Sequence, residues 1–271
     1  MVPTLNIAIT VATNSIKMDK FEKTQERWEA FRSKIAGRLD ELITETEDLF
    51  PLVFEAAEYE TTTFLNAWQG FFSQSQGLIG KLMDTWHEQV EHAFLKTGVK
   101  DNDPIFVAER NKGLELEYQL EKRFRAYEIS AFAKIAKRLL EEVRAILSKD
   151  FCCTQCQAPL EIKQDFFRSY YATCQYCQTV NTFEPGLKAR NIEHFAINAL
   201  GEEAAYAQYE AYEYAKFQNY LTDKKVFKKK ALLKLYEEYL IIFLKKRIEI
   251  IPDYAAEYDK DLESKLNLQK Q

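Results

Sequence analysis

Apolar side chains recur at seven-residue intervals along two neighbouring stretches of the chain. In the first stretch, from about residue 15 to 51, the repeating positions are Phe21, Trp28, Ile35, Leu42 and Leu49. In the second stretch they are Leu65, Phe72, Ile79, Trp86 and Ala93. A seven-residue repeat keeps apolar side chains on one face of an α-helix, and that face must be covered by another element. We therefore expect two long helices that pack against each other along these faces.

A third stretch, from about 105 to 148, has apolar residues mostly four positions apart and predicts a straight helix. Asp103 precedes it as a candidate N-cap, and Pro104 suits the first helical position, where a missing N–H costs nothing. Helical patterns resume later in the chain, over 187–220, 223–250 and a short piece after Pro252. Most of the chain is therefore expected to be helical.

The first residues follow a different pattern. Leu5, Ile7, Ile9 and Val11 alternate with smaller or polar residues, which is the two-residue period of a β-strand. We predict an N-terminal extended arm over 1–14, either a short strand or a loose segment.

The composition agrees with long helices. The 271 residues include 8 glycines and 6 prolines, fewer than the frequent tight turns of a β-sandwich or barrel require. With 46% hydrophobic residues, the chain buries a sizeable core without help from disulfides. The longest apolar run is far shorter than the roughly 20 residues of a membrane-spanning helix, so we expect no transmembrane segment.

Four of the five cysteines form two pairs with the same spacing, Cys153-x2-Cys156 and Cys174-x2-Cys177. Two such cysteines on a tight turn point at one ion, and two such turns complete a tetrahedron of sulfur atoms. The spacing predicts one structural Zn²⁺, because a closed shell of four thiolates leaves no open position for catalysis. The alternative is a pair of redox-active motifs without metal. Cys152 is a spare neighbour of the first pair.

Short strand patterns surround the cysteines, over 160–163, 166–171 and 180–183. The motifs Cys-x2-Cys-x-Ala-Pro-Leu at Cys153–Leu160 and Cys-x-Tyr-Cys-x3-Asn at Cys174–Asn181 resemble the zinc-ribbon superfamily. The resemblance covers 151–185 and implies a small β ribbon around a zinc ion. Ribbons often have glycine after the second cysteine of each knuckle, where the backbone turns to positive φ. This chain has Gln157 and Gln178 at those positions.

These patterns predict a mainly α fold, a long-helix bundle with an inserted small β zinc ribbon. We expect 1–150 to form the first part of the bundle and 151–185 to form the four-Cys zinc ribbon. We expect 186–271 to form C-terminal helices that pack back on the bundle.

The charge is uneven along the chain. The formal net charge of -5 argues against a protein that coats nucleic acid over its whole surface. Residues 221–250, however, include nine basic and four acidic residues. This segment is a solvated helix face, a contact for nucleic acid or an anionic membrane, or a docking helix for an acidic protein. The candidate contacts for an anionic partner are Lys224, Lys225, Lys228, Lys229, Lys230 and Lys234.

Catalytic motifs are scarce in the sequence. The segment His87–His92 resembles a metalloprotease helix but has Glu91 where HExxH needs its second histidine, so we interpret its His/Glu pairs as a solvated face. No phosphate-binding loop, dinucleotide fingerprint or serine elbow is present. An enzyme would need carboxylates such as Glu117, Glu121 and Glu128 to meet inside the bundle. Solvation of these acids is the better interpretation.

The first functional hypothesis is a non-enzymatic helical scaffold or interaction protein, part of a larger assembly. In it the zinc ribbon stiffens the turn between two long helices and offers a small β surface to a protein partner or a second copy of the chain. We expect it in the cytoplasm, because cysteines in metal-ligand pairs suit a reducing compartment and the N-terminus lacks the basic residues of a signal peptide.

The alternative hypothesis is a nucleic-acid-binding zinc-ribbon protein. It would use the basic segment 224–247 for phosphates and the aromatic side chains of the ribbon for base stacking. These aromatic residues are Phe166, Phe167, Tyr170 and Tyr171.

Overall fold

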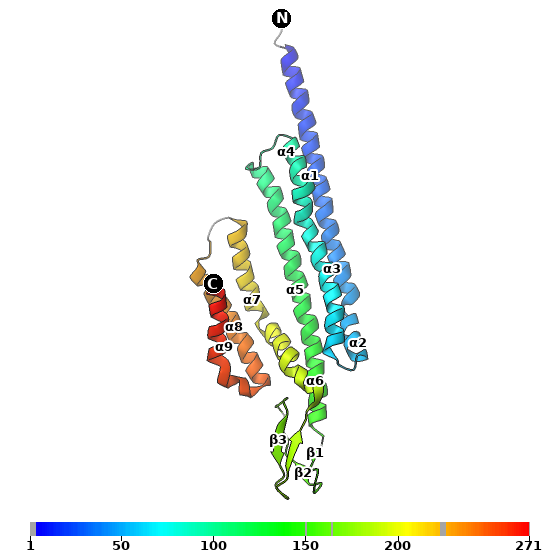
Figure 1. Ribbon diagram of the computed structural model, residues 1–271. Coiled ribbons are helices and arrows are strands. Elements are labelled where there is room, and N and C mark those ends of the chain that lie inside the picture. Colours follow the sequence, from blue (N-terminus) through cyan, green and yellow to red (C-terminus); the bar gives the residue numbers. More distant parts are fainter. Residues whose placement is uncertain (1–3, 150, 164, 223–225, 271) are drawn as a thin grey trace. The chain divides into compact units, whose positions relative to one another are not determined.

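The computed structural model of the protein describes residues 4–149, 151–163, 165–222 and 226–270. Most of these residues are helical, and a small β insertion between helices carries the two cysteine pairs (Figure 1). The predicted fold class is therefore confirmed. None of the helices in the described ranges is long and apolar enough to cross a bilayer.

The chain divides into two compact units, each made of two segments. The first unit is Met1–Thr46 with Gln69–Phe124, and the second is Glu47–Trp68 with Arg125–Gln271. The ribbon and the helices after it belong to the second unit. The sequence-based division into 1–150, 151–185 and 186–271 stays a prediction.

Two tryptophans form the centre of the first unit. Trp28 lies on α1 (Thr4–Thr46), and Trp86 begins the π-helical turn η1 (Trp86–Val90) that follows α3 (Thr61–Thr85). Both side chains are buried, and their ring centroids are 5.6 Å apart. Both positions belong to the seven-residue repeats, so the predicted packing of the two apolar faces is confirmed here.

The π-helical turn shifts the register of the helix that follows it. The seven-residue repeat predicts Ala93 on the buried face of α4 (Glu91–Lys96), but Ala93 is half-buried and Phe94 is completely buried. A π turn holds one residue more than an α turn, which moves the buried position by one. Phe94 then packs on Trp86, with ring centroids 5.9 Å apart.

The start and the end of the first helix differ from the predictions. The extended arm over 1–14 is wrong for residues 4–14, which form the beginning of α1. Once nucleated, a helix extends through residues that include no proline or glycine, and none stands between Pro3 and Gly37. The helix ends at Thr46, and Pro51 instead lies in the first turn of α2 (Leu49–Ala56), where its missing N–H needs no partner.

Helix α5 (Pro104–Leu147) begins as predicted. Pro104 is its first residue, and the backbone N–H of Ile105 donates to Asp103 Oδ1 at 3.0 Å. Further along α5, Gly113 lies against Trp28, and a Cβ atom at this position would meet the indole ring at 2.8 Å. The close approach of α1 and α5 within the first unit therefore depends on a residue without a side chain.

The remaining helices of the second unit follow the β insertion. They are α6 (Gly186–Asn191), η2 (Ile192–Ala196), α7 (Ile197–Leu221), α8 (Lys229–Ile250), η3 (Pro252–Glu257) and α9 (Tyr258–Lys270). Helices α7, α8 and α9 lie side by side (Figure 1), and Tyr209 packs on Tyr239 with ring centroids 5.4 Å apart. These ranges match the helical patterns of the sequence, except that α8 begins at Lys229.

An aromatic core joins three parts of the second unit. Phe64 and Trp68, on α3, pack on Phe132 of α5 with ring centroids 5.1 and 4.9 Å from it. The ring centroids of Phe195, on η2, and Phe132 are 5.6 Å apart. The chain that leaves the β insertion thus returns to the helix that leads into it.

The β insertion consists of two antiparallel hairpins. The strands are β1 (Phe151–Cys152) paired with β2 (Pro159–Leu160), and β3 (Tyr170–Thr173) paired with β4 (Val180–Phe183). On β4, Asn181 and Phe183 are buried while Val180 and Thr182 are exposed, as expected for alternating side chains.

Two of the three predicted strands are shorter than expected. Strand β4 lies where the pattern predicts it, but 160–163 and 166–171 are mostly outside the ladders. Phe167 is completely buried, and the neighbouring Arg168 is hydrogen-bonded to Glu193 of η2. These tertiary contacts hold the segment before β3 away from a regular strand.

Candidate metal centre

The two cysteine pairs lie on two turns that have the same backbone hydrogen bonds. In the β1–β2 turn, Gln157 N–H donates to Cys153 O at 3.0 Å, and Cys153 N–H donates to Ala158 O at 2.8 Å. In the β3–β4 turn, Gln178 and Cys174 make the equivalent bonds at 3.0 and 2.9 Å. The sequence therefore builds one knuckle twice, and each knuckle turns its two sulfur atoms to the same side.

The residue after the second cysteine of each knuckle has positive φ. Gln157 has φ of 61° and Gln178 has φ of 62°. These are the positions where zinc ribbons often have glycine, so the expectation of a left-handed backbone is confirmed. A side chain at such a position costs roughly 1–2 kcal/mol.

The four sulfur atoms predicted as ligands come together. All four lie within 4.8 Å of one another, and Cys153 with Cys177, and Cys156 with Cys174, are separated by 3.6 Å. Sulfur atoms on a tetrahedron with metal bonds of about 2.3 Å are separated by about 3.8 Å. The donor set and its spacing therefore fit a single metal ion, and four thiolates are typical of zinc.

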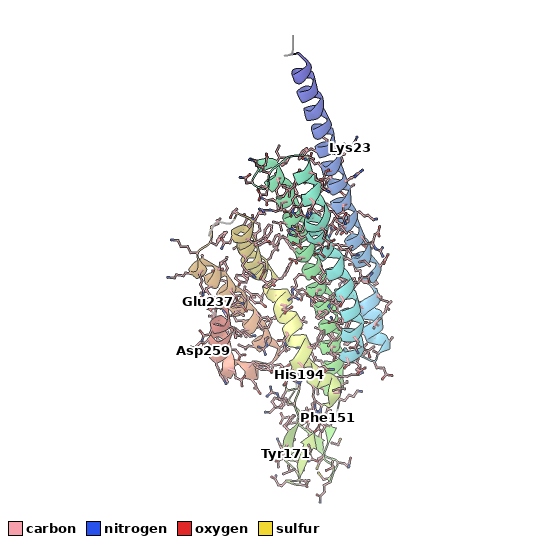
Figure 2. All side chains as sticks on the ribbon, turned by 45° about the horizontal axis from the view of Figure 1, so that its top comes forward. Lys23, Phe151, Tyr171, His194, Glu237 and Asp259 are labelled. Atoms are coloured by element: carbon pink, nitrogen blue, oxygen red, sulfur yellow. The ribbon has the colours of Figure 1, made fainter. Side chains whose placement is uncertain are left out.

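Other donors do not join this group. Cys152 is an exposed free cysteine outside the cluster. Among the residues that the structure describes, no second set of three or more Cys, His, Asp or Glu side chains meets the same spacing. The first cysteine of each knuckle is buried and the second is exposed, so the cluster lies at the surface of the ribbon. The ribbon can be found in Figure 2 by the labels of Phe151 and Tyr171.

Asn181 links the two knuckles from inside the ribbon. It is 5% exposed, and its Oδ1 accepts hydrogen bonds from the backbone N–H and the hydroxyl of Thr154, both at 2.9 Å. Its Nδ2 donates to Thr179 O at 3.0 Å and lies 3.6 Å from Cys153 Sγ. Sequence reasoning noted this asparagine in the motif but gave it no role. The sequence feature that pointed to Asn181 was its position in the motif, where three residues separate it from Cys177.

Hydrogen bonds to the sulfur atoms favour thiolates at two of the four positions. The backbone N–H groups of Cys156 and Gln155 lower the pKa of Cys153 to about 6. The hydroxyl and the N–H of Thr179 lower the pKa of Cys177. At Cys156 the N–H of Ala158 lowers the pKa, but the neighbouring sulfur atoms, that of Cys177 first and then those of Cys174 and Cys153, outweigh it and raise the pKa to about 12. A divalent cation would supply the charge that lets all four sulfur atoms be thiolates together.

The ribbon is fastened to the helices of the second unit by Arg168. Its Nε lies 2.8 and 2.7 Å from the two carboxylate oxygens of Glu193 on η2. Its Nη2 donates to the hydroxyl of Tyr254 on η3 at 3.3 Å. The ring of Tyr254 in turn lies 4.8 Å from the guanidinium of Arg247 on α8. The ribbon therefore contacts two other elements through one side chain.

The predicted anionic-partner contacts fall at the beginning of α8. Lys228, Lys229, Lys230 and Lys234 are exposed. Lys234 Nζ lies 3.9 Å from Glu238, one turn further along the helix. The other two lysines of this prediction, Lys224 and Lys225, lie outside the described residues.

Most ribbon aromatics are used for packing. Phe167 is completely buried, and Phe166 packs edge-to-face on Tyr170 with ring centroids 5.4 Å apart. The exposed member of the predicted set is Tyr171, at 77% exposure. Tyr176, which sequence reasoning did not single out, is 74% exposed.

The remaining candidate residues lie in ordinary helix contacts. His87 Nδ1 lies 3.2 Å from Glu91 on an exposed face, as its spacing predicts. Glu128 accepts a hydrogen bond from Trp68 Nε1 at 3.2 Å and also pairs with Arg125. Burial, followed by the charge of Glu121, raises the pKa of Glu117. The absence of an enzyme activity stays a prediction.

Comparison of the chain with protein-family models, with curated proteins and with solved structures gives no match. The site is therefore interpreted from its own geometry.

Proposed function

We propose that the protein is a non-enzymatic helical interaction scaffold whose four-cysteine ribbon belongs to the zinc-ribbon superfamily and binds one structural Zn²⁺. The observation that carries the proposal is the closed shell of four sulfur atoms within 4.8 Å of one another. Such a shell leaves no position for a substrate or an activated water, so the metal supplies folding energy instead of chemistry. Thiolate ligands persist in a reducing compartment, so we place the protein in the cytoplasm.

The ribbon is suited to stiffening the connection between two helices. It lies between α5 and α6, and Phe132 and Phe195, on either side of it, are in contact. Arg168 adds an ion pair with Glu193, whose side chain is 9% exposed and whose two carboxylate oxygens share the N–H of Arg168 Nε. A ribbon held rigid by zinc therefore fixes the guanidinium that bridges η2 and η3.

We propose that the scaffold works with a protein partner or with further copies of the chain. Binding of nucleic acid is the weaker alternative, because Phe166, Phe167 and Tyr170 are occupied by packing inside the ribbon and stacking needs free rings. The exposed lysines of α8 remain the basis of that alternative.

Metal analysis by mass spectrometry, on full-length protein purified without added metal, tests the site. We expect one zinc per chain, its loss in Cys153→Ser and Cys174→Ser, and its retention in the matched control Cys152→Ser. A chain without zinc whose cysteines are oxidised in pairs would overturn the proposal in favour of a redox role. A second metal ion would reopen the possibility of an enzyme.

Titration with a fluorescent single-stranded oligonucleotide at increasing salt tests the nucleic-acid alternative. Phosphate contacts give binding that weakens steeply as salt rises. We expect no binding at low salt. Strong binding that is lost in a Lys228→Glu, Lys230→Glu variant would replace the scaffold proposal.

A further inference from the structure

Two stretches of the ribbon are free of charged residues, although the protein as a whole is highly charged. Charged residues make up 29% of the chain, yet Phe151–Leu160 and Ser169–Phe183 include no Asp, Glu, Lys or Arg. These two stretches contain the cysteine knuckles and all four strands. The buried centre of a protein interface is depleted in charge and enriched in tyrosine. Nucleic acid would need cations here, and an anionic membrane would need them as well.

Large side chains are exposed in these uncharged stretches. Tyr171, Tyr176 and Val180 are 77%, 74% and 60% exposed. Scattered apolar residues on a surface are ordinary, but Tyr171 and Tyr176 line one groove. Tyr171, which is labelled in Figure 2, lies on β3. Tyr176 lies in the turn that follows β3.

A groove of about 550 Å³ runs between the β2 side of the ribbon and β3. Its lining includes Pro159, Leu160, Tyr170, Tyr171 and Tyr176, together with the charged residues Glu161 and Lys163. Tyr170 closes one end, because its hydroxyl accepts the backbone N–H of Lys163 at 2.8 Å. The lysine ammonium lies over the rings of Phe166 and Tyr170, 5.0 and 5.6 Å from their centroids. The two exposed tyrosines border the open part of the groove.

Strand β3 presents an unpaired edge to this groove. One edge of β3 is paired with β4 over Tyr170–Thr173, and in the described part of the chain no strand is paired with the other edge. Proteins usually protect such an edge with charged side chains, with proline or with a covering segment. β3 has neither charge nor proline, so its free N–H and C=O groups are open to a strand from outside.

We propose that the groove binds an extended peptide segment of a partner protein, which adds as a strand to the free edge of β3 between Tyr171 and Tyr176. Main-chain hydrogen bonds to Tyr170–Thr173 supply affinity, and alternate side chains of the peptide enter the groove. Where the segment lies against Tyr171 and Tyr176 its side chains are apolar, because the stretch Ser169–Phe183 offers no counter-charge to a charged side chain that loses its water. The charged residues in the groove lining, Glu161 and Lys163, precede that stretch. This inference rests on the proposed scaffold function and names the chemistry of its partner.

A second copy of the chain is the less suitable occupant. Pairing of β3 with β3 would involve only the four residues of each strand. A stable dimer needs roughly 800 Å² of buried surface per partner, which so short a strand pair does not supply by itself. A peptide needs less area, because its partner protein contributes further contacts elsewhere.

The test uses zinc-loaded, full-length protein and a displayed library of random nonapeptides. We expect enriched peptides with apolar residues at alternate positions and few charges. In fluorescence anisotropy with one enriched peptide, the double variant Tyr171→Ser, Tyr176→Ser should bind at least about tenfold more weakly. The matched control is Tyr220→Ser, which removes another exposed tyrosine, 68% exposed, from α7.

Backbone pairing is tested on the same peptide. N-methylation of alternate residues should abolish binding in one register and leave it in the other, because only every second N–H faces β3. Failure of the library to enrich any peptide, or equal binding to the double variant, would overturn the proposal. A dimer that forms in light scattering and is lost in the double variant would replace the peptide by a second copy.

The zinc content of each variant separates this proposal from the scaffold function. Unmodified protein that contains one zinc per chain but binds no library peptide would disprove the groove and leave the metal site intact. Absence of zinc in the unmodified protein disproves the proposed function itself, whatever the peptide result.

Discussion

The ribbon and the core of the first unit are stabilised by opposite means. In the first unit, Trp28, Trp86 and Phe94 bury large apolar surfaces and pack ring on ring. In the ribbon the strands have two or four residues each, and the polar groups beside the sulfur atoms are backbone amides, the hydroxyl of Thr179 and Asn181. Hairpins this short are marginal in water by themselves. The first unit therefore folds by burial of large side chains, whereas we expect the ribbon, with its smaller aromatic core, to depend on the proposed metal ion as well.

Removal of zinc should separate the two regions most clearly. Structural zinc contributes about 10–16 kcal/mol of apparent binding free energy at neutral pH, so a strong chelator should unfold the ribbon. The amide signals of β1 to β4 should lose their dispersion in NMR spectra, while far-ultraviolet circular dichroism keeps most of its helical signal. Restored zinc should restore the spectrum. A cooperative loss of all helices would show that the helical cores also depend on the metal.

Truncation of Trp86 should have the reverse effect. Trp86→Ala opens a cavity beside Trp28 and should lower the free energy of unfolding by about 3–5 kcal/mol. Guanidinium unfolding followed by circular dichroism measures this change. Zinc content should stay at one per chain.

The control for that experiment is Ile105→Ala, because Ile105 is 51% exposed at the start of α5. Its effect should stay within about 0.5 kcal/mol. An equally large loss in the control would mean that burial at Trp86 is not the cause.

Asn181→Ala should weaken the metal site without abolishing it. The substitution leaves the N–H of Thr154 without its acceptor and removes the amide beside Cys153 Sγ. Loss of such a supporting partner typically lowers metal affinity by about 10- to 100-fold. Competition with a chromophoric zinc chelator measures this change. The neighbouring exposed position gives the control Thr182→Ala, and equal affinities in the two variants would assign Asn181 no part in the site.

Glycine at the two left-handed positions should give the smallest effect. Gln157→Gly and Gln178→Gly relieve positive-φ strain, and each should raise the stability of the zinc-loaded ribbon by up to about 1 kcal/mol. Chelator midpoints of ribbon unfolding provide the measurement. The control is Gln175→Gly, because Gln175 lies in the β3–β4 turn with Gln178 but does not have positive φ. This change should be neutral or destabilising. Destabilisation by all three changes would mean that the glutamine side chains contribute more than the strain costs.

The sequence predicted those parts of the fold that depend on local periodicity. Trp28 and Trp86 stood at their repeat positions, and Asp103 and Pro104 marked the start of α5. The four cysteines that come together were also identifiable, because metal geometry restricts the spacing of each pair to a few residues. Each of these features is determined by residues that lie near one another in the chain.

Features that depend on distant contacts were not predictable from the sequence. The segment before β3 reads as a strand, but burial of Phe167 and the pair between Arg168 and Glu193 determine its path. The role of Asn181 depends on Thr154, which is on the other knuckle. At the N-terminus a short alternating pattern was outweighed by the uninterrupted helix that follows it.

The π-helical turn at Trp86–Val90 has a consequence for the length of the chain. A helix with such a turn contains one residue more than an uninterrupted α-helix would need to bring the same side chains to its buried face. Deletion of a single exposed residue there, such as Gln89, would convert the turn to an ordinary α turn and still bring Phe94 to the buried face. A chain that is one residue shorter at this point would therefore keep the same core.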